Sequence, residues 1–147
     1  MPNSKEGVAS QRTWTESLKP VLDGVLGDKE PEVIAGALDN FWKALRNLMA
    51  EAFAEPSRYV LQKSVGVFAW NEVAALVFRN CLAAGADFSV AKMEQMLKHA
   101  DQFIEPDFWL GKRHGGQALL YGGRGGFATL ASLIMDQLPE SELEINL

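Results

Sequence analysis

The sequence predicts an all-α fold of about six helices packed around a central apolar helix, with a glycine-rich loop before the last helix. Three observations support this prediction. Apolar residues recur at intervals of three and four along most of the chain, which is typical of helices with one buried face. Residues 67–84 are almost wholly apolar, as expected for a helix surrounded by others. Only residues 118–121 could form a strand, and they are too few to build a sheet.

Length and composition predict a single domain. The 147 residues are 48% apolar, which is enough for one packed core. We expect residues 1–12 to be a disordered N-terminal segment and residues 13–139 to form one helical domain. Residues 140–147 are expected to be an acidic tail.

Charge and cysteine content exclude several classes of protein. The net charge of −5 argues against a nucleic-acid coat protein, because such proteins carry a broad basic face. Cys81 is the only cysteine, so no intrachain disulfide can form, and a small core residue in a reducing compartment is favoured. No apolar signal segment is visible, and charges interrupt the apolar helices, so we expect a cytoplasmic protein without membrane contact.

The first two helices are predicted from their caps and their apolar spacing. One helix is expected from about residue 13, with Thr13 or Thr15 as its N-cap, and Pro20 either shortens it or kinks it. The most clearly periodic helix spans residues 31–54, with Pro31 in the first turn, where proline is tolerated.

The middle of the chain predicts a short helix followed by the central one. A third helix is expected over residues 56–63, and Gly66 is expected to break or tighten it. The apolar helix of residues 67–84 then ends at Gly85, a typical C-cap residue.

Two further helices complete the predicted domain. Ser89 is expected to cap a helix that ends before Pro106, and Phe88 with Met93 has the spacing of a hydrophobic staple. The last helix is expected over residues 127–138.

The most distinctive stretch is residues 111–126, which hold seven of the thirteen glycines and three positive charges without an acid. Glycine permits positive φ and close approach of a ligand, and N–H groups at the start of a following helix attract anions. The stretch lacks the Gly-Lys-Ser/Thr of a phosphate loop and the glycine spacing of a dinucleotide site.

Three interpretations of this stretch stay open: a flexible solvated loop, a contact with an anion or nucleic acid, and a catalytic role. Phe108 and Trp109, just before it, are interpreted as an anchor onto the core, with a base-stacking or peptide-docking platform as the alternative. The candidate binding residues, for an anion, a nucleic acid or a partner, are Lys112, Arg113, Arg124, Gly122, Gly123, Gly125, Gly126 and Trp109.

Catalytic and metal chemistry find little support in the sequence. His99 and His114 have no Cys, Asp or Glu partner at metal-ligand spacing, and no serine lies in a nucleophile elbow. Asp101, Glu105 and Asp107 cluster at a helix end, where acidic side chains are usually solvated. We therefore predict no catalytic residue, no metal site and no cofactor.

The order of several motifs resembles a known family. Residues 59–66, Tyr-Val-Leu-Gln-Lys-Ser-Val-Gly, precede the apolar helix, and Asp-Phe-Ser at 87–89 and Asp-Phe-Trp at 107–109 follow it. Tyr-Gly-Gly-Arg-Gly-Gly-Phe at 121–127 then leads into the last helix. Across residues 41–138 this order resembles the C-terminal helical region of DGQHR-domain proteins, which are bacterial proteins of mobile elements and DNA phosphorothioation clusters. The Asp-Gly-Gln-His-Arg motif and the N-terminal ParB-like half of that family are not found in this sequence.

The resemblance implies a non-enzymatic helical module that binds or regulates in bacterial DNA-modification or mobile-element biology. Its partner would be a ParB-like half or a DNA-modification component. The alternative is a nucleic-acid- or phosphate-binding protein acting through the basic glycine-rich loop 111–126. A third interpretation is an oligomerisation domain that uses the helix of residues 31–54, and an enzyme is the least favoured.

Overall fold

The computed structural model describes residues 8–111 and 114–139 and confirms the all-α fold. Among these residues no sheet forms, and the only bridge is an isolated antiparallel pair between Tyr59 and Leu110. The α-helices are α1 (Gln11–Ser17), α2 (Pro31–Leu48), α3 (Ala50–Ala54), α4 (Ser64–Ala83), α5 (Val90–Leu97) and α6 (Gly123–Met135). Shorter π- and 3₁₀-helical segments are η1 (Val21–Val25), η2 (Lys98–Ile104), η3 (Pro106–Trp109) and η5 (Ala118–Tyr121).

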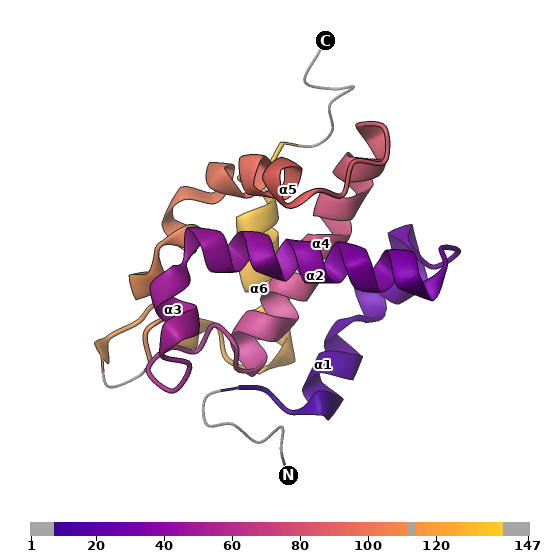
Figure 1. Ribbon diagram of the computed structural model, residues 1–147. Helices are drawn as coiled ribbons and strands as arrows, with labels where there is room; N and C mark the ends of the chain where they lie inside the picture. The colour runs from indigo at the N-terminus through magenta and orange to yellow at the C-terminus, as the bar shows by residue number, and fades with distance from the viewer. Residues whose placement is uncertain (1–7, 112–113, 140–147) are drawn as a thin grey trace.

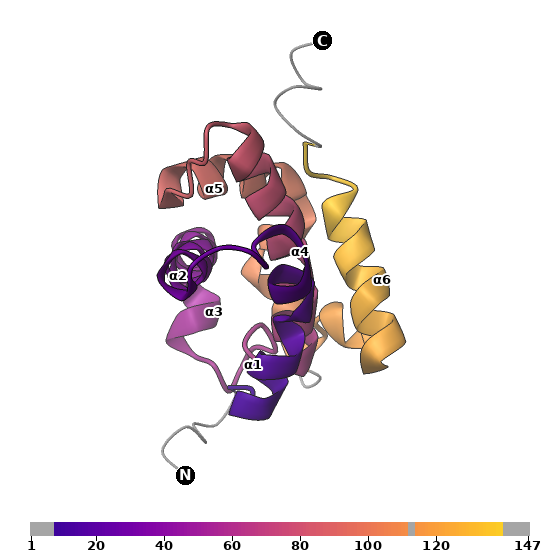
Figure 2. The ribbon, with the colours of Figure 1, turned by 90° about the vertical axis from the view of Figure 1, so that its right-hand side faces the viewer.

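The central apolar helix is α4. Figures 1 and 2 show it running through the middle of the molecule, with α6 on one side and α2 and α3 on the other. Its Trp70 and Phe78 are fully buried, and both rings lie about 6 Å from the ring of Phe41 in α2. Helix α4 is long and apolar enough to cross a membrane, but 67% of that stretch is buried inside this fold. Packing against neighbouring helices therefore accounts for its composition.

The first helix begins earlier than predicted. Its N-cap is Ser10, whose hydroxyl accepts a hydrogen bond from the Thr13 N–H at 3.2 Å. The preceding Ala9 N–H donates to the carbonyl of Gln62 at 2.6 Å. The helical domain therefore starts before residue 13. Residues 1–7 and the predicted acidic tail, residues 140–147, lie outside the described residues.

The periodic stretch 31–54 forms two helices rather than one. Helix α2 ends at Leu48, because Met49 adopts φ −131° and ψ 51°. Met49 and Ala52 are both fully buried, so the turn brings both side chains into the core. No glycine or proline marks this position, and tertiary packing overrides the local helical pattern.

Residues 56–63 do not form the predicted third helix. The Val60 N–H donates to the carbonyl of Trp109 at 2.6 Å, and the Gly111 N–H donates to the carbonyl of Arg58 at 2.9 Å. These long-range hydrogen bonds satisfy backbone groups that a local helix would otherwise pair.

Helix α4 begins at Ser64 and runs through Gly66, where the sequence predicted a break. A Cβ atom on Gly66 would lie 1.8 Å from the carbonyl oxygen of Leu61. Glycine is therefore required there by close backbone approach, and not by a turn.

The caps of the last two helices differ in how well they were predicted. Ser89 caps α5 as expected, since its hydroxyl accepts a hydrogen bond from the Lys92 N–H at 3.2 Å. Helix α6 begins at Gly123, four residues before the predicted start, and its N-cap is Gly122. The end of the glycine-rich segment is therefore the first turn of a helix.

Candidate functional site

The structure describes only some of the residues of the predicted glycine-rich site. Lys112 and Arg113 lie outside the described residues. Gly123 has φ +75°, which L side chains rarely adopt, and a Cβ on Gly126 would lie 2.5 Å from the carbonyl carbon of Tyr121. Both glycines are explained by the tight entry into α6.

Arg124 has a partner that the sequence did not predict. Its guanidinium donates to the carboxylate of Glu16 in α1 and lies 4.4 Å from the ring centroid of Phe68 in α4. Glu16 also accepts a hydrogen bond from Arg12 at 3.2 Å, and this bond, together with the charge of Arg124, lowers the pKa of Glu16. The acidic surface met by Arg124 is therefore a helix of the same chain.

Trp109 is an anchor, and its place among the candidate binding residues has to be corrected. Its side chain is fully buried, and its Nε1 donates to the carbonyl of Phe103 at 2.7 Å. Its ring packs 5.1 Å from Phe108 and 5.8 Å from Trp70, measured between ring centroids. A residue in this position cannot stack on a ligand at the surface.

Titratable groups do not form a reactive cluster in the part of the chain that the structure describes. No three His, Cys, Asp or Glu side chains among the described residues lie close enough to hold a metal ion. Burial raises the pKa of Tyr59 and that of Glu72, but the two belong to different segments and no ion pair or hydrogen bond joins them.

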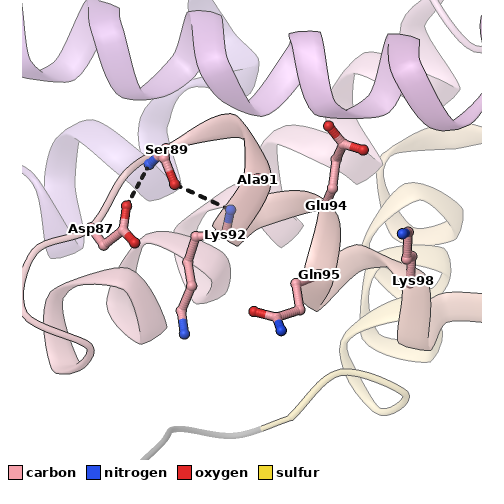
Figure 3. Close-up of a pocket in the computed structure, with 7 residues that line it drawn as sticks. All are labelled: Asp87, Ser89, Ala91, Lys92, Glu94, Gln95 and Lys98. Atoms are coloured by element: carbon pink, nitrogen blue, oxygen red, sulfur yellow. Dashed lines mark hydrogen bonds between the residues drawn. The ribbon is translucent and has the colours of Figure 1, made fainter.

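A polar hollow of about 510 Å³ runs along α5 (Figure 3). The carboxylate of Asp87 accepts hydrogen bonds from Ser89, which lower the pKa of Asp87, and Glu94 accepts one from Asn47 at 3.0 Å. These polar groups serve caps and helix contacts, and the hollow lacks the aromatic wall common in ligand sites. Its lining residues are Asp87, Ser89, Ala91, Lys92, Glu94, Gln95 and Lys98.

A second depression, of about 230 Å³, lies where α1, α2, α3 and the segment before α4 meet. We call it the aromatic groove. Four of its residues come from α2 at spacings of three and four, so they form one stripe on that helix. The lining residues are Trp14, Asp39, Trp42, Lys43, Arg46, Phe53 and Gln62.

Three aromatic side chains form the apolar part of the aromatic groove. The rings of Trp14 and Trp42 meet edge to face, with centroids 4.9 Å apart and an interplanar angle of 63°. Phe53 also packs edge to face against Trp42, with a centroid distance of 6.2 Å. All three side chains are half-buried, so part of each aromatic surface remains accessible.

A chain of hydrogen bonds links the indole of Trp42 to the core and to the backbone of α1. The Trp42 Nε1 donates to the Asn71 Oδ1 at 2.8 Å, and the Asn71 Nδ2 donates to the Ser17 Oγ at 2.7 Å. The Ser17 hydroxyl in turn donates to the carbonyl of Trp14 at 2.7 Å. Asn71 and Ser17 are buried, so the orientation of Trp42 is set by the core of the protein.

Sequence reasoning missed the aromatic groove. Helical spacing places Trp14 and Trp42 beside the buried faces of their helices, and it does not show that part of each side chain stays accessible. The groove forms where α1, α2 and α3 meet, whereas helical periodicity describes each helix separately and does not predict how helices meet.

Comparison with known proteins finds no family model, curated protein or solved structure that matches this chain.

Proposed function

We propose that the chain is a non-enzymatic helical binding module whose aromatic groove takes a large apolar side chain of a partner protein. The observation that carries this proposal is the half-buried set of Trp14, Trp42 and Phe53, in which the indole of Trp42 is held by hydrogen bonds to the core. Tryptophan side chains dominate binding energy at protein interfaces when they line a pocket of fixed shape. Because the core already orients Trp42, little conformational freedom is lost on binding.

The size of the aromatic groove favours a side chain over a small-molecule ligand. Its volume of about 230 Å³ is below the range of about 300–1,000 Å³ that is usual for ligand pockets. One buried apolar side chain contributes about 1.5–3 kcal/mol, so a single anchoring residue would bind weakly and reversibly.

The four tryptophans allow a direct test in ¹⁵N-labelled protein. We expect millimolar addition of the peptide Gly-Ser-Ala-Phe-Ala-Ser-Gly to shift the indole N–H signals of Trp14 and Trp42. The signals of Trp70 and Trp109 should stay in place, because both side chains are fully buried away from the groove.

Two variants complete this test. Trp14→Ala should remove the shift at Trp42, whereas Leu120→Ala, at a side chain that is 81% exposed, should leave it unchanged. Circular dichroism checks that both variants are folded. Equal shifts at all four indoles, or full binding by Trp14→Ala, would contradict the proposal.

The resemblance across residues 41–138 supplies a biological setting for this module, namely bacterial DNA modification or mobile elements. The partner that inserts the side chain would then be a ParB-like half or another component of a DNA-modification system. Sequencing the genes that flank the coding sequence tests this setting. A neighbouring frame for a ParB-like protein, whose product binds this chain and fails to bind Trp14→Ala, is the expected result.

A further inference from the structure

We infer that the aromatic groove selects a peptide in which the apolar anchor is flanked by acidic residues, and this inference rests on the proposed function. The aromatic side chains of Trp14, Trp42 and Phe53 would pack against the apolar anchor residue of the peptide. Arg46, a cation of α2 that lines the same groove, would hold a flanking carboxylate.

The charges that line the groove leave one cation uncompensated. The Nζ of Lys43 lies 2.9 Å from a carboxylate oxygen of Asp39 one turn away, and both side chains are exposed. Arg46, one turn further along α2, is exposed and forms no ion pair or hydrogen bond with any residue that the structure describes. The lining of the aromatic groove therefore carries a net charge of +1 on a chain whose net charge is −5.

The position of Arg46 favours a carboxylate beside an apolar group. Its guanidinium can donate two parallel hydrogen bonds to one carboxylate, a geometry that lysine does not offer. It lies on the same stripe of α2 as Trp42, four residues further on, so the two side chains are neighbours on the helix surface. An acidic residue next to the anchor in the sequence of the partner would thus reach Arg46.

A nucleic acid fits this groove less well than an acidic peptide does. Polyanion binding relies on several cations that each release a counterion, and this groove offers one unpaired guanidinium. The remaining charge of the protein is negative and repels a long phosphate backbone. A single flanking carboxylate interacts mainly with the charges that line the groove, because charges beyond about 8 Å are largely screened at physiological salt.

Three peptides of equal length test the inference by the same indole shifts: Gly-Ser-Glu-Phe-Glu-Ser-Gly, its neutral Ala version and its Lys version. We expect the Glu peptide to bind about fivefold more tightly than the Ala peptide, since an exposed ion pair contributes up to about 1 kcal/mol. The Lys peptide should bind more weakly than both. Raising the salt concentration should bring the three affinities together.

Arg46→Glu is expected to reverse this order, so that the Lys peptide binds most tightly. Arg79→Glu is the matched control, because it makes the same charge change at an exposed residue of α4 that does not line the groove. Arg79→Glu should keep the wild-type order.

The possible outcomes separate the inference from the proposed function. If the Ala peptide binds and the Glu peptide binds no better, the acidic preference is wrong and the binding module stands. If no peptide shifts Trp14 or Trp42, both are wrong. Adenosine monophosphate serves as a further probe, and tighter binding of this nucleotide than of the Glu peptide would overturn the peptide assignment.

Discussion

Trp42 packs against the core and also lines the aromatic groove, and its indole N–H donates a hydrogen bond to the buried Asn71. Its position beside the buried stripe of α2 follows from helical spacing. Its bond to Asn71 does not, because α4 supplies that residue from a distant part of the sequence. At the scale of single residues, sequence therefore predicts which side chains are buried better than it predicts which buried polar groups meet.

The variant Asn71→Leu tests this hydrogen-bond chain. It leaves the indole N–H of Trp42 and the hydroxyl of Ser17 without the buried partner that they now share. We expect the free energy of unfolding to fall by about 2 kcal/mol, measured by urea denaturation, because an unpaired buried polar group costs about 1–3 kcal/mol. Asn47→Leu, which removes an exposed amide contact, should cost less than about 1 kcal/mol.

A double variant separates the energy of the hydrogen bond between Trp42 and Asn71 from the effect of changing the size of each side chain. If the indole and the amide act together, Trp42→Phe should destabilise the Asn71→Leu protein by less than it destabilises the wild type. Additive losses would show that the hydrogen bond between them contributes little.

At the scale of helices, the elements that depend on local signals were predicted and those set by distant contacts were not. The apolar helix α4 and the Ser89 cap of α5 follow from composition and capping chemistry. The break at Met49 and the non-helical course of residues 56–63 follow from burial and from hydrogen bonds to the segment around Trp109. The aromatic groove includes Phe53 of α3, which packs against Trp42 of α2 across that break, so a feature that sequence could not predict contributes to the site.

Gly66 separates local preference from tertiary contact within α4. Helix propensity alone predicts that Gly66→Ala stabilises the protein by up to about 1 kcal/mol. The added Cβ would meet the carbonyl oxygen of Leu61 at 1.8 Å, so we expect destabilisation by at least about 2 kcal/mol instead. Gly36→Ala, at an exposed position of α2 with open space around the added atom, should be stabilising. A thermal melt of Gly66→Ala at or above the wild-type temperature would contradict this packing.

At the scale of the whole molecule, the two candidate sites lie on different sides of α4. Helix α6, whose first turn is the end of the glycine-rich segment, covers one side, and α2 and α3, which carry most of the aromatic groove, cover the other (Figure 2). Helix α1 touches both regions, because Glu16 pairs with Arg124 while Trp14 lines the groove. It is also held by the bond between Ser17 and Asn71, so its position does not depend on Arg124 alone.

Arg124→Ala decides between the structural and the nucleic-acid interpretations of residues 111–126. The Arg124 side chain is 69% exposed and engaged with Glu16, so its loss should cost less than about 1 kcal/mol and leave peptide binding unchanged. We expect single- and double-stranded DNA and RNA not to bind the wild type at physiological salt, because a phosphate would have to displace Glu16 on a chain of net charge −5. The nucleic-acid interpretation would instead be supported by a titration at low salt in which the wild type binds, Arg124→Ala binds more weakly and Glu16→Gln binds more tightly than the wild type. Phosphate contacts release counterions, so such binding would also have to fall steeply as the salt concentration rises.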